Sequence, residues 1–431
     1  METEIKKISD FVDQEVTLKG WLYNKRSSGG IVFLELRDGT GFIQAVAKED
    51  NLDEDGWKKV QDLTQESSVR VTGEVSSHAK KEDECELQVS DLDIIHLNED
   101  KYPIDLKEHG PDFLLQNRHL WIRDPKQWAI LKIRDTIVRA IRGYMNKNNF
   151  TLTDAPIFTP NACEDTTELF EVEYFEDDEA YLSQSGQLYL EAAIMSVRRA
   201  YDFGPVFRAE KSTTKRHLTE FWMMDAEAAF IEHEENMDLQ EELIQHIISE
   251  CLDNCGRAFD VLDRDTDKLQ SVADNKFVRL TYRETIERLQ EMGSDIEYGD
   301  DLSNNDEAIL TKDSDVPIFI EKWPEQLKPF YMKQDESGDY MLNNDLIATE
   351  EGGEISGGSQ REDDYETLLK RIEEEGLEKE NYDWYLDLRK YGSVPHSGFG
   401  VGIERIIRWV SGVEHVRETI PFPRLVNRIR P

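Results

Sequence analysis

Two arginine-bearing stretches carry the residue types that bind phosphate. Residues 204–210 (GPVFRAE) are an apolar run that contains Arg208, and Arg216 follows in a polar stretch before a second apolar run at residues 219–227 (TEFWMMDAE). Guanidinium groups bind phosphate and carboxylate oxygens through paired hydrogen bonds. A strand, a basic loop and a returning strand would therefore bring both arginines to one anion-binding site.

A glycine-rich turn later in the chain also carries an arginine that could bind phosphate. Residues 398–410 (GFGVGIERIIRWV) run from closely spaced glycines into an amphipathic helix, with Arg405 near its start. Glycines let a ligand approach the backbone closely. The spacing is not GxGxxG and no βαβ pattern surrounds it, so the stretch does not predict a dinucleotide fold.

Between these stretches lies an acidic, glycine-rich one. Residues 345–361 (DLIATEEGGEISGGSQR) place Asp345 and Glu354 beside a strand pattern that ends at Arg361. Mg²⁺ is commonly held by one or two carboxylates together with substrate phosphates. The stretch therefore predicts a Mg²⁺-polyphosphate site, although each stretch alone has a plainer interpretation, because a buried arginine beside a glutamate is usually a structural ion pair.

The elements that must position these residues fall into two regions. From residue 16 to 97, short alternating apolar runs are broken by turn residues, which predicts a small antiparallel barrel. Residues 98–111 are polar and read as a linker. Beyond about residue 114, helical patterns mix with apolar strand runs, which predicts an α+β domain on one large sheet. The expected helices are residues 127–147 and 237–255, and the expected strands include residues 204–210, 219–230, 316–323 and 330–334.

The charge of the chain is extreme. Its 431 residues include 51 Lys and Arg against 91 Asp and Glu, a net charge of −40. Such a chain repels polyanions unless it keeps a local basic track or works in concentrated salt, where the screening length falls to about 3 Å at 1 M. Two interpretations of the surplus carboxylates stay open, namely solvated loops and adaptation to a high-salt cytoplasm.

Other bulk features indicate the compartment. No uncharged apolar run reaches the 18 residues that a membrane span needs, and the N-terminus lacks the pattern of a secretory signal. The four cysteines are too few and too scattered for a disulfide framework. We expect a cytoplasmic protein with no membrane partner.

Taken together and in this order, the three stretches resemble motifs 2 and 3 of class II aminoacyl-tRNA synthetases and the acidic strand between them. Residues 150–156 (FTLTDAP) resemble motif 1, and residues 115–123 (LQNRHLWIR) resemble the hinge segment of that family. The N-terminal barrel resembles the OB-fold anticodon-binding domain of the aspartate, asparagine and lysine group. The resemblance implies an OB-fold domain at residues 1–100, a hinge or linker at residues 101–125 and a catalytic domain at residues 126–431.

The resemblance implies a ligase that activates an amino acid with ATP and Mg²⁺ and transfers it to tRNA. Arg208 would bridge the α-phosphate and the substrate carboxylate, while Phe221 and Arg405 would cover the two faces of adenine. Arg208, Glu210 and Arg405 are the expected catalytic residues, and Glu354 with Asp345 would hold the metal. The implied ATP site consists of Arg208, Glu210, Arg216, His217, Leu218, Phe221, Glu354, Gly402 and Arg405.

The choice of amino acid depends on donors and acceptors, because aspartate and asparagine are nearly isosteric and mispaired buried polar groups are costly. Aspartate enzymes usually carry a lysine where this chain has Leu190, whereas Arg361 would donate to the side-chain oxygen and Asp225 would be a free acceptor for an amide. We therefore expect L-asparagine and tRNA(Asn). Asp225 keeps the alternative of an aspartate enzyme, possibly a non-discriminating one, because asparagine enzymes usually have Glu there. The implied amino-acid site consists of Glu164, Gln184, Gln187, Leu190, Arg208, Asp225 and Arg361.

Two partners of macromolecular size are implied. In the barrel, Phe33 would stack on an anticodon base while Arg26 and Gln44 bond neighbouring groups, although the strand pattern alone favours Phe33 as a core residue. Motif 1 around Pro156 implies a homodimer. An inactive paralogue would be expected to lose motif arginines, and an asparagine-making paralogue would be expected to lack the barrel, whereas this chain keeps both features.

Overall fold

The computed structural model describes residues 1–78, 84–163, 168–175 and 180–431. They form two compact units, Met1–Leu114 and Leu115–Pro431. No helix in these described ranges is long and apolar enough to cross a membrane.

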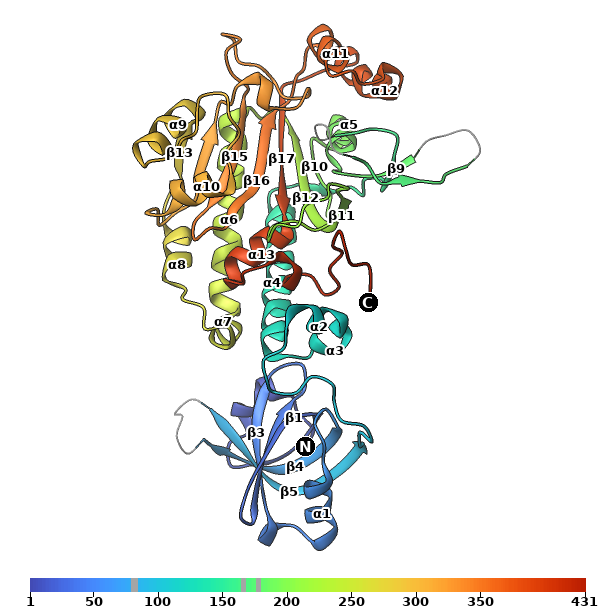
Figure 1. Ribbon diagram of the computed structural model, residues 1–431, viewed down its shortest axis with the longest axis vertical. Helices are drawn as coiled ribbons and strands as arrows, with labels where there is room; N and C mark the ends of the chain where they lie inside the picture. Colours follow the sequence, from blue (N-terminus) through green and yellow to red (C-terminus); the bar gives the residue numbers. More distant parts are fainter. Residues whose placement is uncertain (79–83, 164–167, 176–179) are drawn as a thin grey trace. The chain divides into compact units, whose positions relative to one another are not determined.

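The first unit is a closed five-stranded barrel in the order β1-β2-β3-β5-β4 (Figure 1). Its neighbours pair antiparallel except β3 and β5, which pair parallel. The period-two pattern decides which side chains enter the core, because Val32, Leu34 and Leu36 are buried while Phe33 between them is not in the core cluster. The elements are η1 (Ile5–Phe11), β1 (Glu15–Ser28), β2 (Ile31–Arg37), β3 (Phe42–Lys48), η2 (Glu49–Asn51), α1 (Glu54–Asp62), β4 (Ser68–Ser77) and β5 (Cys85–His96).

The second unit is built on a nine-stranded sheet, which confirms the expected α+β domain. Its path runs β13-β14-β15-β16-β17-β12-β10-β6, with β11 paired to β12, and only its two outer pairs, β13–β14 and β10–β6, are parallel among the described strands. The strands are β6 (Thr151–Leu152), β10 (Arg199–Tyr201), β11 (Gly204–Phe207), β12 (Glu220–Ala229), β13 (Val278–Thr281), β14 (Ile318–Glu321), β15 (Asn343–Ala348), β16 (Gly353–Gln360) and β17 (His396–Gly402). A small separate sheet contains β7 (Phe158–Thr159), β9 (Ala180–Leu182) and β8 (Glu171–Val172).

Two long helices cover one face of the large sheet. Helix α4 (Pro125–Lys147) begins where Asp124 accepts a hydrogen bond from the Lys126 amide, and α6 (His233–Asn254) begins with a capping box. Both expected helices are thus confirmed, and they share the main core with the sheet. The other helical elements are α2 (Pro111–Gln116), α3 (Arg118–Trp121), α5 (Gln187–Val197), α7 (Gly256–Leu262), α8 (Asp267–Asp274), α9 (Tyr282–Glu291), α10 (Asn304–Thr311), η3 (Glu325–Leu327), α11 (Tyr365–Glu374), α12 (Lys379–Lys390), α13 (Ile403–Ser411) and η4 (Val416–Glu418).

One expected strand is wrong. Residues 330–334 make only isolated bridges, Met332 with Arg361 and Gln334 with Met341. Phe330 and Tyr331 are both buried in a cluster with Tyr385, so the apolar residues that suggested an alternating strand instead pack on both sides of an irregular segment. This segment forms one wall of the cavity described next.

Candidate active site

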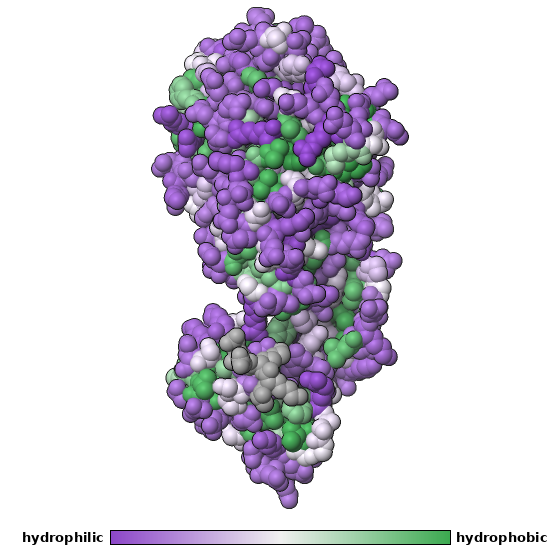
Figure 2. All heavy atoms as spheres, turned by 90° about the vertical axis from the view of Figure 1, so that its left-hand side faces the viewer, coloured by the Kyte–Doolittle hydropathy of each residue, from purple (hydrophilic) through white to green (hydrophobic). Residues whose placement is uncertain are grey.

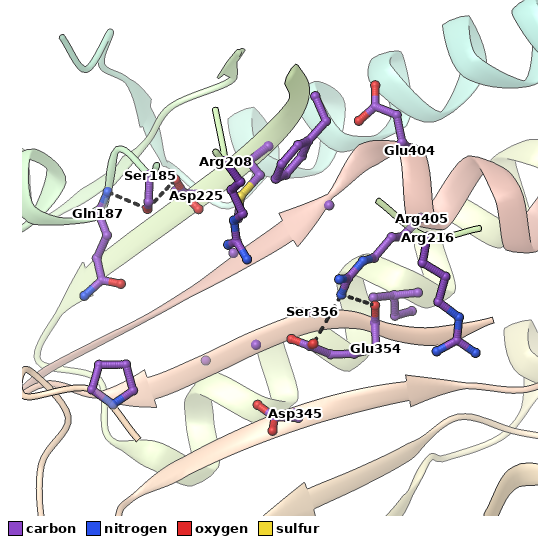
Figure 3. Close-up of a pocket in the computed structure, with 18 of the residues that line it drawn as sticks. Ser185, Gln187, Arg208, Arg216, Asp225, Asp345, Glu354, Ser356, Glu404 and Arg405 are labelled. Carbon is purple, nitrogen blue, oxygen red and sulfur yellow. Dashed lines mark hydrogen bonds and ion pairs between the residues drawn. The ribbon is translucent and has the colours of Figure 1, made fainter. Parts of the chain in front are cut away.

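A cavity of about 380 Å³ lies on the sheet where β12, β15, β16 and β17 are adjacent (Figure 3). Residues from all four strands line it, with β17 contributing only glycines, and α13 and the irregular segment before β15 line it as well. Twelve of the residues predicted from the sequence line this one cavity: Gln187, Arg208, Arg216, His217, Leu218, Phe221, Asp225, Asp345, Glu354, Arg361, Gly402 and Arg405.

At one end the cavity presents two arginines from different elements. Arg208 follows β11, and its guanidinium carbon lies 5.6 Å from the centre of the Phe221 ring. Arg405 lies in the first turn of α13, where its Nη1 donates to the Glu354 carbonyl at 3.0 Å and to Glu354 Oε2 at 3.2 Å. These contacts fix a guanidinium beside an aromatic face, an arrangement that suits a nucleotide with its phosphates.

Arg216 is held by an acidic helix. Its Nη1 donates to Asn304 Oδ1 at 2.8 Å and to Glu307, both on α10, and its Nη2 donates to the Glu351 carbonyl at 3.1 Å. A Cβ at Gly353 would lie 2.3 Å from Arg216 Nη1, and Gly353 has a φ of +76°. Only glycine therefore allows the guanidinium to cross the start of β16 at this point.

His217 lies beside three arginines. Burial and the positive charges of Arg405, Arg208 and Arg216 lower the pKa of His217 from its ordinary value. The imidazole is therefore neutral near pH 7 and offers one N–H donor, so it adds a hydrogen bond to this end of the cavity without adding charge.

Two carboxylates face each other across the strand pair β15 and β16. The register shifts between Leu346 and Ile347, so that Glu354 and Gly357, three residues apart, both face the cavity. A Cβ at Gly357 would lie 3.3 Å from Glu354 Oε1 and 3.6 Å from Asp345 Oδ1. Burial, with the added effect of the Glu354 charge, raises the pKa of Asp345 to about 6, although Lys328 opposes this.

The opposite end of the cavity contains polar groups that already have partners. Arg361 Nε donates to Glu227 Oε1 at 3.1 Å, and its Nη1 donates to Ser359 Oγ at 2.6 Å. Asp225 was expected to be a free acceptor, which is wrong: its Oδ2 accepts from Ser185 Oγ at 2.9 Å and from the Gly186 amide at 2.8 Å. The sequence could not reveal this pairing because Ser185 comes from a separate segment 40 residues earlier.

The candidate tRNA-binding residues of the barrel lie on adjacent strands. Arg26 of β1 pairs in register with Phe33 of β2, and Glu35 of β2 pairs with Gln44 of β3. The Gln44 amide donates to Glu86 Oε1 at 2.7 Å. Phe33 is partly exposed on the outer face, so the interpretation of Phe33 as a core residue is wrong.

Comparison with known families identifies both units. Residues 110–426 match the class II tRNA synthetases (D, K and N), and residues 16–95 match the OB-fold nucleic acid binding domain. The chain belongs to the class II aminoacyl-tRNA synthetases. The expected ligase family and the OB-fold are thus confirmed.

Solved structures similar to this synthetase come from several organisms. Asparaginyl-tRNA synthetase from Pyrococcus horikoshii complexed with asparaginyl-adenylate is 40% identical, with a TM-score of 0.94 and full coverage of both chains. Asparaginyl-tRNA synthetase from Entamoeba histolytica in complex with asparaginyl-adenylate is 31% identical with a TM-score of 0.87, covering 100% of this chain and 99% of that one. Aspartyl tRNA synthetase from Entamoeba histolytica is 26% identical with a TM-score of 0.84, covering 100% and 93%.

Three residues expected at the synthetase's ATP and amino-acid sites, Gln184, Glu210 and Leu190, are not among the described residues that line the cavity. Glu164 lies outside the described residues. Gln184 is buried, and its Oε1 accepts from the Cys163 amide at 3.2 Å. Glu210 lies beyond the end of β11 and is not among the lining side chains. Leu190 packs in a small core cluster with Ile194, Ala200 and Ala229 and is not among the residues that line the cavity, whereas Gln187, one turn earlier on α5, is.

The sequence also missed residues that do line the cavity. Tyr331 belongs to the segment 330–334 that was mistaken for a strand, Lys328 lies just before that segment at the end of η3, and Ser185 and Ser356 were given no role. Glu404, next to Arg405, is held by Arg134 Nη1 at 2.7 Å and by the Trp222 amide at 2.9 Å. Only the lysine carried a signal that could have been noticed, since it is a cation within an apolar run.

Proposed function

We propose that this synthetase activates L-asparagine with ATP and transfers the asparaginyl group to tRNA(Asn). The observation that carries the proposal is the pairing of Arg361 with Glu227 beside Asp225. Glu227 neutralises the guanidinium, so Arg361 offers hydrogen bonds without a net positive charge, while Asp225 offers a carboxylate. An amide side chain satisfies a donor and an acceptor, whereas the carboxylate of aspartate would meet the negative charge of Asp225.

The similarity to known enzymes supports the same choice. The relatives that are 40% and 31% identical are asparaginyl-tRNA synthetases complexed with asparaginyl-adenylate, and the aspartyl enzyme is 26% identical.

The proposed reaction needs no side-chain nucleophile. The asparagine carboxylate attacks the α-phosphorus of ATP, which forms asparaginyl-adenylate and releases pyrophosphate, and the terminal adenosine of tRNA then takes the asparaginyl group. Arg208 neutralises the developing charge on the α-phosphate, and Arg216 and His217 bind the outer phosphates. Phe221 and Arg405 hold the adenine, and Gln187 lies where it reaches the amino-acid end. Positioning and charge neutralisation supply the catalysis.

Asp345 and Glu354 fit a Mg²⁺ ion that accompanies ATP. One oxygen of each faces the space over Gly357, and no third Asp, Glu, His or Cys of the described chain joins them as a metal-binding group. Mg²⁺ commonly keeps several waters and takes its other ligands from phosphates, so two carboxylates suffice. When bound, the ion would supply further neutralisation of phosphate charge.

Two macromolecular contacts and a location complete the proposal. The outer face of the barrel, with Phe33, Arg26 and Gln44, supports binding of the tRNA anticodon.

Two features support a homodimer through the edge of the large sheet. Strand β6 lies at this edge, and the side chains of Ile157 and Phe158, beside Pro156, are 41% and 52% exposed. Analytical ultracentrifugation should give the mass of a dimer, and a monomer at micromolar concentration would contradict this part. All four cysteines are free thiols, which supports a cytoplasmic location.

The aspartate alternative is kept by Asp225, the shorter carboxylate that aspartate enzymes use at this position. ATP–pyrophosphate exchange with asparagine and aspartate side by side decides between them. We expect kcat/KM for asparagine to exceed that for aspartate by about 10²-fold or more, because the wrong side chain leaves buried polar groups mispaired. Equal values, or a preference for aspartate, would reject the asparagine assignment.

A further inference from the structure

Lys328 is a partly buried cation beside the two carboxylates that are proposed to bind the metal ion. Its Nζ lies 2.6 Å from Asp345 Oδ2 and 4.0 Å from the centre of the Trp323 ring, and its side chain is only 12% exposed. The backbone amide of Lys328 closes the short helical turn η3 by donating to the Glu325 carbonyl at 3.1 Å. The ammonium is thus fixed by a carboxylate and an aromatic ring.

The two carboxylates share one pattern of partners. Glu354 Oε2 accepts a hydrogen bond from Arg405 at 3.2 Å, and Asp345 Oδ2 accepts one from Lys328 at 2.6 Å. The other oxygen of each, Oε1 and Oδ1, lies within 3.3 and 3.6 Å of the position that a Cβ at Gly357 would take. We call the space between these two oxygens the Gly357 notch.

The charges around the Gly357 notch cancel. Two carboxylates carry two negative charges, and Lys328 and Arg405 carry two positive ones. A free divalent cation is held by excess negative charge, which this quartet does not have. The negative phosphates of ATP would supply that excess at the moment of binding.

We propose that Lys328 is a positioning residue that keeps the Gly357 notch from taking up a free divalent cation, so that the metal ion enters together with ATP. The inference rests on the proposed use of ATP and Mg²⁺. Arg405 is also proposed to bind the adenine, whereas the Lys328 ammonium contacts Asp345 and Trp323. Charge balance at Asp345 is therefore the role that the surroundings of Lys328 support.

The test is the binding of Mn²⁺ to the nucleotide-free enzyme, followed by electron paramagnetic resonance. Lys328→Met keeps an unbranched apolar chain against Trp323 and removes the charge. We expect Mn²⁺ to bind Lys328→Met at least tenfold more tightly than wild type, and Lys328→Gln to behave similarly. Lys328→Arg should retain the weak binding of wild type. With ATP present, the difference between wild type and Lys328→Met should shrink.

Lys333→Met is the matched control. Lys333 pairs with Asp363 and does not line the cavity, so this variant makes the same change in net charge away from the Gly357 notch. Its Mn²⁺ affinity should equal that of wild type. An equal increase in Lys333→Met and Lys328→Met would overturn the inference, because the effect would then come from overall charge.

Glu354→Gln, made in the Lys328→Met variant, tests the metal assignment at Asp345 and Glu354 separately from the role of Lys328. Loss of the tight Mn²⁺ binding supports the Gly357 notch as its location. If binding persists unchanged, the metal assignment fails and the inference fails with it. If Glu354→Gln alone weakens Mn²⁺ binding but neither Lys328→Met nor Lys328→Gln strengthens it, the metal assignment survives and the role of Lys328 is rejected.

Discussion

The cationic side chains of the cavity are positioned by carboxylates before any ligand arrives. Arg361 is paired with Glu227, Arg216 with Glu307, and Lys328 with Asp345. Preorganised donors stabilise developing charge without reorganisation during the reaction, which is where most electrostatic catalysis arises. The carboxylates also explain how a chain of net charge −40 offers a site for polyphosphate, because they hold the cations in one place.

Arg208→Ala should abolish most amino-acid activation. Arg208 faces the cavity beside Phe221, and loss of one charge-stabilising donor group typically lowers rates by about 10²- to 10³-fold. ATP–pyrophosphate exchange measures this effect, and circular dichroism checks that the fold is kept. Arg208→Lys is the matched variant: it keeps the charge but loses the planar fork, so it should recover only part of the activity. Normal exchange by Arg208→Ala would contradict the assigned role.

Asp202 makes stability depend on pH. Burial and the charge of Asp225 raise the pKa of Asp202 from 3.8 to about 8. A carboxyl group whose pKa is raised in the folded state stabilises the fold fully below its unfolded pKa, and this contribution is lost as pH rises from about 4 through about 8. Asp202→Asn should therefore flatten the fall of the unfolding free energy between pH 5 and pH 9, by about 1 kcal/mol or more. Urea titrations at each pH would show it, and parallel profiles for the two proteins would refute it.

At the scale of elements, glycines in β17 make room for the charged side chains of β12. A Cβ at Gly398 would lie 1.9 Å from Glu227 Oε1, and one at Gly400 would lie 2.7 Å from Asp225 Oδ1. The register of β12 against β17, with Asp225 opposite Gly400 and Glu227 opposite Gly398, sets these approaches. The glycines of β17 therefore leave space for the carboxylates of Asp225 and Glu227 on β12.

Gly353→Ala tests the turn into β16. A methyl group there would meet Arg216 and would also strain a backbone with a φ of +76°. We expect a loss of about 1 kcal/mol or more in stability, together with a raised KM for ATP. Gly376→Ala is the control, because Gly376 has a φ of +71° with nothing within 4 Å of an added Cβ. It should lose a similar amount of stability with an unchanged KM, and the same KM in both variants would reject the link to Arg216.

Phe33→Ala tests the outer face of the barrel. Stacking of a base on an aromatic side chain contributes about 1 to 3 kcal/mol, so tRNA binding should weaken by roughly 5- to 150-fold. Filter binding of tRNA measures this change, and amino-acid activation should be unaffected because Phe33 belongs to the barrel and not to the second unit. Equal losses in tRNA binding and in activation would argue for a structural role of Phe33.

At the scale of the whole molecule, the excess of acidic residues sets the charge of the protein, −40. The face drawn in Figure 2 is mostly hydrophilic, with scattered apolar patches. The chain has 91 acidic and 51 basic residues, and the excess acidic residues must lie largely on surfaces and loops. Self-repulsion of this kind opposes the compact state.

Potassium chloride should therefore stabilise the enzyme. The screening length falls from about 10 Å at 0.1 M to about 3 Å at 1 M, which weakens repulsion between surface carboxylates. If the weaker repulsion raises the free energy of unfolding by ~1 kcal/mol, the melting temperature should rise by about 2 to 4 °C. Differential scanning calorimetry across this range measures the shift, and a flat or falling melting temperature would contradict it. An activity optimum near 0.1 M would in turn reject adaptation to a high-salt cytoplasm.

The sequence by itself determined the two folds and twelve of the residues that line the cavity. Period-two and helical patterns predicted the barrel and the helices α4 and α6, because local burial patterns follow directly from backbone geometry. Arg208, Arg405 and Glu354 were found because their residue types and order match a family whose chemistry needs cations and carboxylates around a polyphosphate.

The tertiary structure decided which groups are paired. The shifted register between β15 and β16 brings Glu354 and Gly357 to one face, which simple alternation along a strand would not predict. Ser185 reaches Asp225 across 40 residues, and Lys328 at the end of η3 reaches Asp345 across 17 residues. Sequence pattern reports local periodicity, whereas partners distant in the chain are fixed only by packing.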